Sequence, residues 1–182
     1  RRPAIVPFYL LAGMVVLYPL LRATGLWDGQ WLIDASNLLF GSARSESLAT
    51  RVFSERILAQ HGMLRPVLGW GGWGRNRPAG VTTITDSLWI ITFGTRGLLG
   101  LASLFGTMLA PVLLLHRRVP VRLWRHPAMM GVLFAATASL LWMCDNLFNA
   151  MFNPIFVIMA GGLASLIPPR FAPMTRGRGR GR

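Results

Sequence analysis

The sequence predicts an all-α integral membrane protein with about four transmembrane helices and one large extracytoplasmic loop that carries short amphipathic helices. Hydrophobic residues make up 53% of the 182 residues and charged residues only 14%, and the mean hydropathy is +0.47. The apolar residues also form long blocks, whereas a soluble core would interleave them with polar residues. Helices are the expected spanning elements, because lipid leaves the backbone polar groups no other partner outside a closed barrel.

Four segments have the roughly 20 apolar residues that a helix needs to cross a hydrocarbon core of about 30 Å. They cover about residues 3–21, 97–115, 127–144 and 151–167. The chain is accordingly expected to consist of a first transmembrane helix (1–24), an extracytoplasmic loop (25–85), a second transmembrane helix (86–115), a basic cytoplasmic loop (116–126), a transmembrane helical hairpin (127–167) and a basic disordered cytoplasmic tail (168–182).

The arginines predict the orientation of these spans, since cytoplasmic segments of membrane proteins carry an excess of basic residues. All of the basic residues are arginine; eleven lie at the two termini and between the second and third spans, and seven lie between Arg22 and Arg77. The six acidic residues are all expected on the same side of the membrane as the second group, or at its boundary. We therefore expect a multi-pass protein of the bacterial inner (cytoplasmic) membrane with cytoplasmic termini. Arginines distributed in this way argue against nucleic acid as a partner.

Two further features limit the possible functions. Cys144 is the only cysteine, so an intrachain disulfide or a cysteine-based metal cluster is excluded, and neither a metal nor a cofactor is expected. The chain begins with Arg1 and Arg2 and has no initiator methionine. We therefore expect a fragment, such as the C-terminal part of a longer protein.

Within the loop, residues 45–60 have the periodicity of an amphipathic helix. The predicted apolar face includes Val52 and Phe53, and the polar face includes Arg51 and Glu55. Because these two charged residues are four positions apart, an ion pair between them on the helix surface is an alternative to a role of Arg51 in binding. Trp27 and Trp31 are typical of a segment at the headgroup level.

The loop then leads into the second span through a series of motifs. After Arg51 come Pro-Val-Leu-Gly-Trp-Gly at residues 66–71, the polar pair Asp86-Ser87, nine further residues, and Gly-Leu-Leu-Gly at residues 97–100. This order resembles the C-terminal half of the O-antigen ligase and polysaccharide polymerase superfamily. That family has loop arginines, a turn of the form proline–apolar–apolar–glycine–x–glycine, and a motif of histidine, then asparagine, serine or glutamine, nine residues, and glycine-x-x-glycine. Asp86 stands where the family has its histidine.

The resemblance implies transfer of a glycan from a polyprenyl-diphosphate donor to an acceptor hydroxyl at the extracytoplasmic face. Asp86 would be the catalytic base, since carboxylates act as bases in many glycosyl-transfer reactions. Arginine suits the diphosphate, because its donors are bidentate and permanently charged. The expected partners are a lipid-linked oligosaccharide and anionic lipid headgroups. The candidate substrate-binding residues are Arg51, Arg65, Arg75, Arg77, Arg96, Trp70 and Trp73.

Each candidate also has a purely structural interpretation. Asp86 could cap the second span, and Arg96 could extend to the membrane surface from the start of that span. Arg75 and Arg77 could contact headgroups, and the two tryptophans could be interfacial anchors. Small residues in membrane helices commonly serve packing, which is the favoured interpretation of Gly97, Gly100 and Gly106. For the polar group Asp145, Asn146, Asn149 and Asn153, satisfying the backbone of a turn is favoured over forming a pocket.

A competing function is a non-catalytic transmembrane subunit of a larger membrane complex. The missing motif histidine and the shortness of the chain favour it, because four spans are few for enclosing a lipid-linked donor. A transporter ranks third, since the spans lack the paired buried charges and broken helices expected of one.

Overall fold

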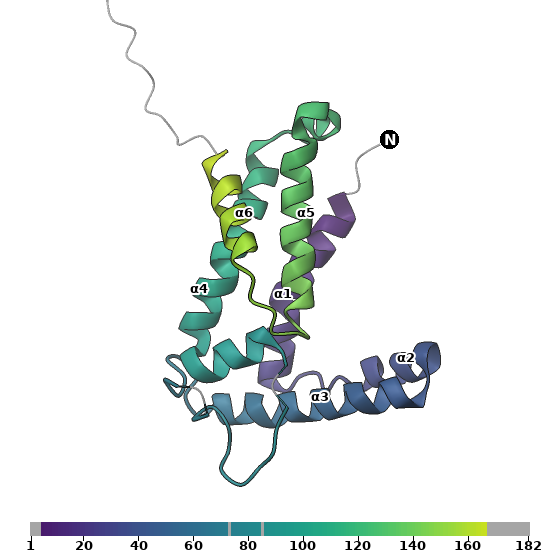
Figure 1. Ribbon diagram of the computed structural model, residues 1–182, viewed down its shortest axis with the longest axis vertical. Helices are drawn as coiled ribbons and strands as arrows, with labels where there is room; N and C mark the ends of the chain where they lie inside the picture. The colour runs from purple at the N-terminus through teal and green to yellow at the C-terminus, as the bar shows by residue number, and fades with distance from the viewer. Residues whose placement is uncertain (1–4, 73, 85, 167–182) are drawn as a thin grey trace, which may run out of the picture.

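The computed structural model describes residues 5–72, 74–84 and 86–166, and these residues form helices and connecting loops with no strand. Four helices form an elongated bundle, and a helical hairpin lies across one end of it (Figure 1). In chain order the elements are α1 (Ile5–Thr24), α2 (Gln30–Phe40), α3 (Ser42–Gly62), α4 (Leu88–Arg118), the 3₁₀ helices η1 (Val121–Arg125) and η2 (Pro127–Met129), α5 (Met130–Asp145) and α6 (Pro154–Ser165).

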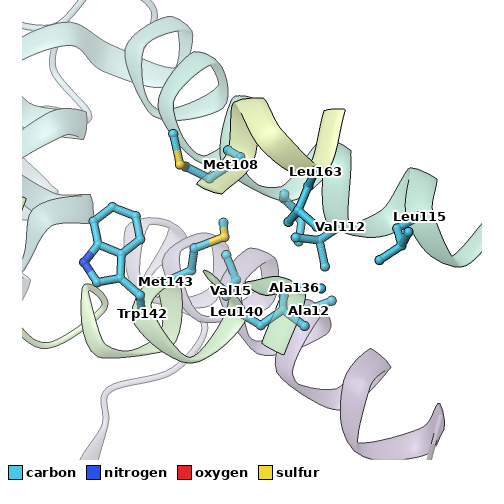
Figure 2. Packing of buried hydrophobic residues seen from close by; sticks show 12 residues of the cluster. Ala12, Val15, Met108, Val112, Leu115, Ala136, Leu140, Trp142, Met143 and Leu163 are labelled. Atoms are coloured by element: carbon cyan, nitrogen blue, oxygen red, sulfur yellow. The ribbon is translucent and has the colours of Figure 1, made fainter. Parts of the chain in front are cut away.

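The bundle is held together by an apolar core to which α1, α4, α5 and α6 all contribute. Val112 and Leu140 have no exposed surface, and Val15 of α1 packs into the same cluster (Figure 2). A second cluster lies where α3 meets the bundle, and it includes Leu58, Trp89 and Phe93. The first cluster holds the bundle helices to one another, and the second fixes the hairpin to them.

Three helices are long and apolar enough to cross a membrane. They are Ile5–Thr24, Leu88–Arg118 and Pro127–Asp145. In each of them, only 28% of the most apolar 18-residue stretch is buried within the protein. Apolar surface that remains exposed on such helices is what contact with lipid permits. The observations are consistent with the predicted all-α membrane protein.

The predicted fourth span is a shorter helix in the structure. Helix α6 has 12 residues, which corresponds to about 18 Å at 1.5 Å per residue and falls short of a core of about 30 Å. The described part of the chain therefore contains three candidate spans and one shorter apolar helix. The predicted disordered tail, residues 168–182, lies outside the described residues.

Helices α2 and α3 form the hairpin, which projects sideways from the end of the bundle (Figure 1). The helix predicted over residues 45–60 is present within α3. The expected faces are right for Val52, which is buried, and for Arg51, which is exposed, but wrong for Phe53 and Glu55. Phe53 is 65% exposed, whereas Glu55 is only 5% exposed. The reason is that the bundle offers Glu55 several hydrogen-bond donors, so the side of α3 that packs against it is defined by a buried polar group as well as by apolar contacts.

Helix α4 consists of two helical segments that meet at Gly97. The backbone at Gly97 has φ 65° and ψ −164°, which no α-helix contains and which essentially only glycine adopts. The segment before Gly97 lies across the end of the bundle, and the segment after it runs along the bundle (Figure 1). The second span thus starts to run along the bundle at Gly97, where the apolar run was predicted to begin, although the helix itself begins at Leu88.

Candidate functional site

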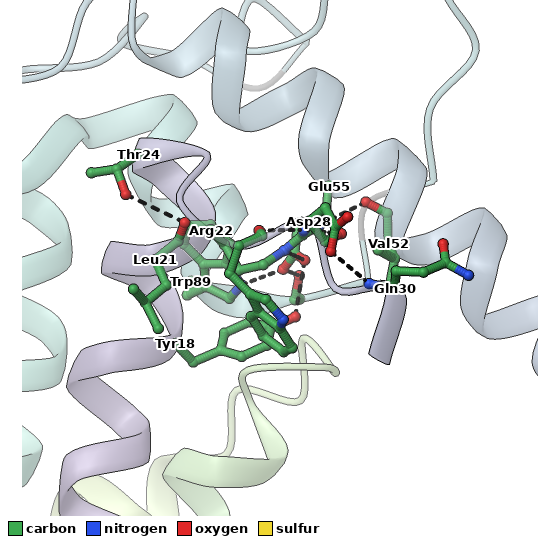
Figure 3. A network of polar contacts seen from close by, with 11 residues as sticks. Tyr18, Leu21, Arg22, Thr24, Asp28, Gln30, Val52, Glu55 and Trp89 are labelled. Atoms are coloured by element: carbon green, nitrogen blue, oxygen red, sulfur yellow. Dashed lines mark hydrogen bonds and ion pairs between the residues drawn. The ribbon is translucent and has the colours of Figure 1, made fainter. Parts of the chain in front are cut away.

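A buried carboxylate lies where α1, α3 and α4 meet. Glu55 Oε2 accepts hydrogen bonds from the Tyr18 hydroxyl and from Arg22 Nε, both at 2.9 Å. Its other oxygen accepts from the Trp89 indole N–H and from the Ser87 hydroxyl, the latter at 3.4 Å. Figure 3 shows Tyr18 and Arg22 of α1 and Trp89 of α4 converging on Glu55 of α3. We call these five residues the Glu55 network.

Arg22 extends the network to the start of the hairpin. Its two terminal nitrogens donate to the backbone carbonyls of Trp27, Asp28 and Val52, at 3.2, 2.6 and 2.7 Å. The side chains of Arg22 and Glu55 are only 2% and 7% exposed, so the charges are compensated almost entirely within the protein. Such pairing is what a buried charge requires. The single arginine thereby fixes the turn between α1 and α2 against α3.

The carboxylate of Glu55 holds helices together and is poorly suited to exchanging protons with a ligand. Burial raises the pKa of Glu55, and Arg22 beside it acts in the opposite direction. Both carboxylate oxygens already accept two hydrogen bonds. A proton acceptor for chemistry needs a free lone pair directed at the substrate, which Glu55 does not offer.

The Glu55 network was not predicted from the sequence. Arg22 entered only the count of loop arginines, and Glu55 was expected as a surface partner of Arg51. That surface pair is absent, since Glu55 is bonded to Arg22. The available signal was the position of Arg22 in the last turn of a membrane span: a charge at that depth either reaches water or finds a partner on another element.

Arg51 pairs instead with Asp86, at 3.4 Å between Nε and Oδ2. The two residues come together because residues on both sides of Asp86, Ile84 and Ser87, are bonded to α3. The Ile84 N–H donates to the Ser54 hydroxyl at 3.2 Å, and the Ser87 hydroxyl donates to Glu55, the next residue of α3. Both charged side chains remain accessible, with exposed fractions of 46% and 42%.

This pair lies at a pocket of about 110 Å³. Glu55, Ser87 and Tyr18 contribute to its lining, together with apolar atoms of Leu147 and Phe148. The proposed capping role of Asp86 is absent: the residue that precedes α4 is Ser87, and no side chain caps the helix there. The pocket therefore presents one accessible carboxylate and one accessible guanidinium next to a buried polar network.

The motif at residues 66–71 and the glycine motif at residues 97–100 form one structural unit. On one side of the break in α4, the N–H groups of Trp70 and Gly71 donate to the carbonyls of Gly94 and Thr95, at 2.9 and 2.8 Å. On the other side, the N–H groups of Leu98 and Leu99 donate to the carbonyls of Pro66 and Val67, at 2.7 and 3.2 Å. The loop thus supplies the partners that the interrupted helix lacks. We call residues 66–71 the docked loop.

The glycines of this unit are close-approach positions, which corrects the expectation that Gly97 and Gly100 serve helix packing. A β-carbon on Gly97 would overlap the carbonyl group of Val67, and one on Gly69 would collide with the backbone from Thr95 to Gly97. A β-carbon on Gly100 would overlap the β-carbon of Arg96. Gly106, by contrast, has no atom close to its missing β-carbon. The spacing of the motif therefore makes room for the docked loop and for the side chain of Arg96.

Trp70 anchors the docked loop to α3. Its ring stacks on the His61 imidazole with 4.3 Å between ring centres, and its N–H donates to the His61 carbonyl at 3.1 Å. The Arg65 guanidinium lies over the same ring at 4.4 Å, which is a cation–π arrangement. These contacts give Trp70 and Arg65 a structural role, and their sugar- or phosphate-binding role stays a prediction.

The other candidates lie around the break. Arg96 is exposed and lines a groove of about 510 Å³ beside Gly71 and Gly72. Arg75 is exposed and its carbonyl is bonded by His61, while Arg77 is half-buried. Trp73 lies outside the described residues.

The predicted site residues therefore do not converge on one point. Arg51 and Asp86 lie together, whereas Arg65, Trp70 and Arg96 lie around the docked loop. His61, which carries the Trp70 stack, is ten positions after Arg51 on the same helix, or about 15 Å along its axis at 1.5 Å per residue. The structure has two candidate sites at the hairpin end of the bundle, one at the Arg51–Asp86 pair and one at Arg96.

The asparagine-rich turn before α6 has the structural role that was favoured for it. Asn146 donates to the Trp142 carbonyl at 2.8 Å, Asn149 donates to Asp145 at 2.7 Å, and Asn153 accepts from the Ile155 N–H at the start of α6. The carbonyls of Asn146 and Asn149 also accept from the Leu88 N–H. The turn thereby holds the start of α4 in place.

Within the described ranges, no group of three histidine, cysteine, aspartate or glutamate side chains could hold a metal ion. No family model matches the sequence, and comparisons with curated proteins and with solved structures find no match. The function must therefore be argued from the geometry.

Proposed function

We propose that this chain belongs to a membrane glycan ligase or polymerase of the O-antigen ligase type, which transfers a glycan from a polyprenyl diphosphate to an acceptor hydroxyl. The observation that carries the proposal is the contact between Arg51 and Asp86, at 3.4 Å and in the lining of a pocket. These residues stand at the arginine and histidine positions of the motif series, 35 positions apart. The contact between the other two motifs, at residues 66–71 and 97–100, supports the same proposal.

In this reaction Asp86 accepts the proton of the acceptor hydroxyl. The oxygen of that hydroxyl forms a bond to the anomeric carbon of the donor sugar, and the bond from that carbon to the phosphate oxygen breaks. The diphosphate leaves with the bonding electrons. Arg51 orients the Asp86 carboxylate, and the half-exposed position of both side chains leaves the carboxylate open to a hydroxyl. The reaction needs no metal.

The proposed setting is the extracytoplasmic face of the bacterial inner membrane, with both termini in the cytoplasm. Two features support this arrangement. The hairpin end of the bundle carries the acidic residues and the pocket, whereas the opposite end carries Arg117, Arg118, Arg122 and Arg125, which are all exposed. Basic residues concentrated at one end favour the cytoplasmic side for that end.

The test is a transfer assay in membrane vesicles that contain the full-length protein, a lipid-linked oligosaccharide and an acceptor glycolipid. Asp86→Asn is expected to lower the transfer rate by about 100-fold or more, the usual contribution of a general base. Arg51→Ala is expected to give a similar loss at unchanged protein level. Arg56→Ala is the matched control, since Arg56 is exposed on the same helix and does not line the pocket.

One further variant sharpens the test. Asp86→His restores the residue of the family motif and also supplies a base, so it is expected to retain transfer where Asp86→Asn loses it. Unchanged transfer by both Arg51→Ala and Asp86→Asn would refute the assignment.

The second candidate is a non-catalytic transmembrane subunit of a larger membrane complex. The observation in its favour is that only 28% of the most apolar 18-residue stretch of each candidate span is buried within the chain. Most of the surface of these helices is therefore left uncovered by this chain. Such surface can be covered by further helices as well as by lipid. Stoichiometric co-purification with other membrane proteins, together with full function of the complex carrying Asp86→Asn, would favour this candidate over the enzyme.

A further inference from the structure

Helix α2 carries a patch of exposed apolar side chains. None of its eleven residues is buried, although the helix packs along α3 in the hairpin. Trp31, Leu38, Leu39 and Phe40 are all exposed, and Leu38, at 87%, is the most exposed large apolar side chain among the described residues. Single apolar residues on a surface are ordinary, but a group of four on one short helix indicates a contact with another apolar phase.

The polar residues of α2 lie on a different face from this patch. Gln30, Asp34 and Asn37 recur at helical spacing, and the Gln30 amide donates to the Asp34 carboxylate at 3.0 Å. Trp31 and Leu38 are seven positions apart, or about two turns at 3.6 residues per turn, and therefore share another face. The helix is thus amphipathic on the surface that α3 leaves uncovered.

The start of α2 is fixed close to the end of α1. Helix α1 ends at Thr24 and α2 begins at Gln30. Arg22 holds the connection between them, because its guanidinium donates to the carbonyls of Trp27 and Asp28. Since α1 is long and apolar enough to cross a membrane, the connection lies within a few residues of the point where the span leaves the lipid.

The direction of the hairpin brings α2 along the membrane surface. The candidate spans run along the bundle, so a hairpin that projects sideways from its end extends parallel to the bilayer (Figure 1). In the same view α2 lies on the side of α3 toward the bundle, which places it nearer to the lipid than α3. A helix of eleven residues is too short to cross the hydrocarbon core. An amphipathic helix at this level is typical of one that lies in the interface.

The charge at the tip of the hairpin suits the same environment. The Arg44 guanidinium lies over the Phe40 ring, 5.9 Å from its centre, and both side chains are exposed. A long basic side chain can keep its charge among anionic headgroups while the neighbouring ring lies deeper. The apolar patch and the basic tip therefore complement the two layers of a bilayer surface.

We propose that α2 lies in the membrane interface, with Trp31 and Leu38 in contact with lipid acyl chains and Asp34 directed toward water. The occupant of this face is lipid because the patch continues the lipid-facing surface of α1, and within the described residues no part of the chain covers it. The hairpin thereby holds α3 at a fixed level above the acyl chains. This inference goes beyond the proposed function and applies to either candidate function, since it requires only that the spans cross the membrane.

The test measures the surroundings of a fluorophore that is attached to single cysteines. The full-length protein in a Cys144→Ser background is reconstituted in vesicles of phosphatidylcholine and phosphatidylglycerol. Leu38→Cys reports on the apolar face, and Asn37→Cys, the preceding residue on the polar face, is the matched control. Both positions are exposed, so a label there does not disturb the packing of the protein. The quenchers are iodide in water and lipids with a nitroxide near the headgroup end or near the methyl end of the acyl chain.

The label at residue 38 is expected to lose more fluorescence to the shallow nitroxide than to the deep one, because an interfacial helix buries its apolar face by about 5–10 Å. It should also lose less fluorescence to iodide than the label at residue 37. Equal iodide quenching of the two labels without nitroxide quenching would overturn the proposal, because the face would then lie in water. Equal nitroxide quenching of the two labels would overturn the assigned faces.

Protection of residue 38 from iodide without nitroxide quenching would also overturn the proposal, because protein would then cover the face. Protection that disappears as the protein is diluted in lipid would identify that protein as a second copy of the chain. A label in Trp31→Cys tests the direction of the helix. It should be quenched at the same depth as the label at residue 38, and quenching at only one of the two would show that α2 leaves the interface. None of these measurements uses glycan transfer, so they are independent of the proposed function.

Discussion

The carbonyl group of Val67 occupies the space where a β-carbon on Gly97 would lie. Gly97 also has φ 65° and ψ −164°, so an alanine there is strained by its own backbone as well as by the docked loop. We expect Gly97→Ala to destabilise the protein by about 2 kcal/mol, from the cost of this backbone region. It should also release residues 66–71 from α4. Thermal unfolding in detergent measures the first effect, and faster chymotryptic cleavage after Trp70 measures the second.

Gly106→Ala is the control for this prediction, because Gly106 lies in the same helix with open space around its missing β-carbon. Alanine has the higher helix propensity, so this variant should be neutral or more stable by up to about 1 kcal/mol. Equal stability of the two variants would contradict the role assigned to Gly97.

The buried ion pair between Arg22 and Glu55 gives the second prediction. Glu55→Gln keeps the size of the side chain but leaves the Arg22 charge buried without a counter-charge. Removing one partner of a buried pair typically costs about 3–5 kcal/mol. We therefore expect a loss of about 3 kcal/mol or more in the free energy of unfolding, measured by denaturant or thermal unfolding in detergent. The loss should be smaller in Arg22→Met/Glu55→Gln, because that variant leaves no uncompensated charge.

Glu46→Gln serves as the control, since Glu46 is an exposed residue on the same helix. It should change the free energy of unfolding by less than about 0.5 kcal/mol, as surface substitutions usually do. A similar small effect of Glu55→Gln would mean that the pair does not hold α1 against α3.

The helical fold could largely be predicted from the sequence, because long apolar blocks specify spans directly. The three candidate spans and the helix within residues 45–60 follow from hydropathy and periodicity. The limits appear at Glu55 and Gly97. Periodicity treats every charged residue as exposed, so it assigned Glu55 to the wrong face. A glycine in an apolar run looks the same in the sequence whether the helix continues or breaks. The break at Gly97 depends on hydrogen bonds from a loop about 30 residues earlier in the chain, and hydropathy does not reveal them.

The candidate site was predictable in its residues and not in its arrangement. Arg51 and Asp86 were both named, but their contact depends on the hydrogen bonds of Ile84 to Ser54 and of Ser87 to Glu55, which hold this part of the chain against α3. The separation of Arg96 from Arg51 was also beyond the sequence, since both are basic residues expected at the same membrane level. Motifs in the sequence indicate which chemical groups are available, whereas only the fold determines which of these groups come into contact.

The ion pair between Arg51 and Asp86 gives a prediction that separates a functional pair from a structural one. Both side chains are more than 40% exposed, so solvent screens their interaction. We expect Arg51→Ala, Asp86→Ala and the double variant each to change stability by less than about 1 kcal/mol, with a coupling energy within about 0.2–1 kcal/mol. Unfolding measurements on the four proteins of this cycle test it. A coupling well above that range would indicate that the pair is mainly structural, and loss of transfer in these variants would then reflect misfolding.

The orientation of the bundle gives the last prediction, which uses two alanines at its opposite ends. Ala79 lies in the segment between α3 and α4, Ala128 lies in η2, and both are exposed. In a Cys144→Ser background, which removes the one native thiol, Ala79→Cys should react with a membrane-impermeant maleimide in intact spheroplasts. Ala128→Cys should react only after permeabilisation, because the arginine-rich end is expected to face the cytoplasm. Neither substitution changes a charge, so the comparison does not itself disturb the distribution that sets the topology. The reverse labelling pattern would place the Asp86 pocket on the cytoplasmic side, where an extracytoplasmic glycan transfer could not take place.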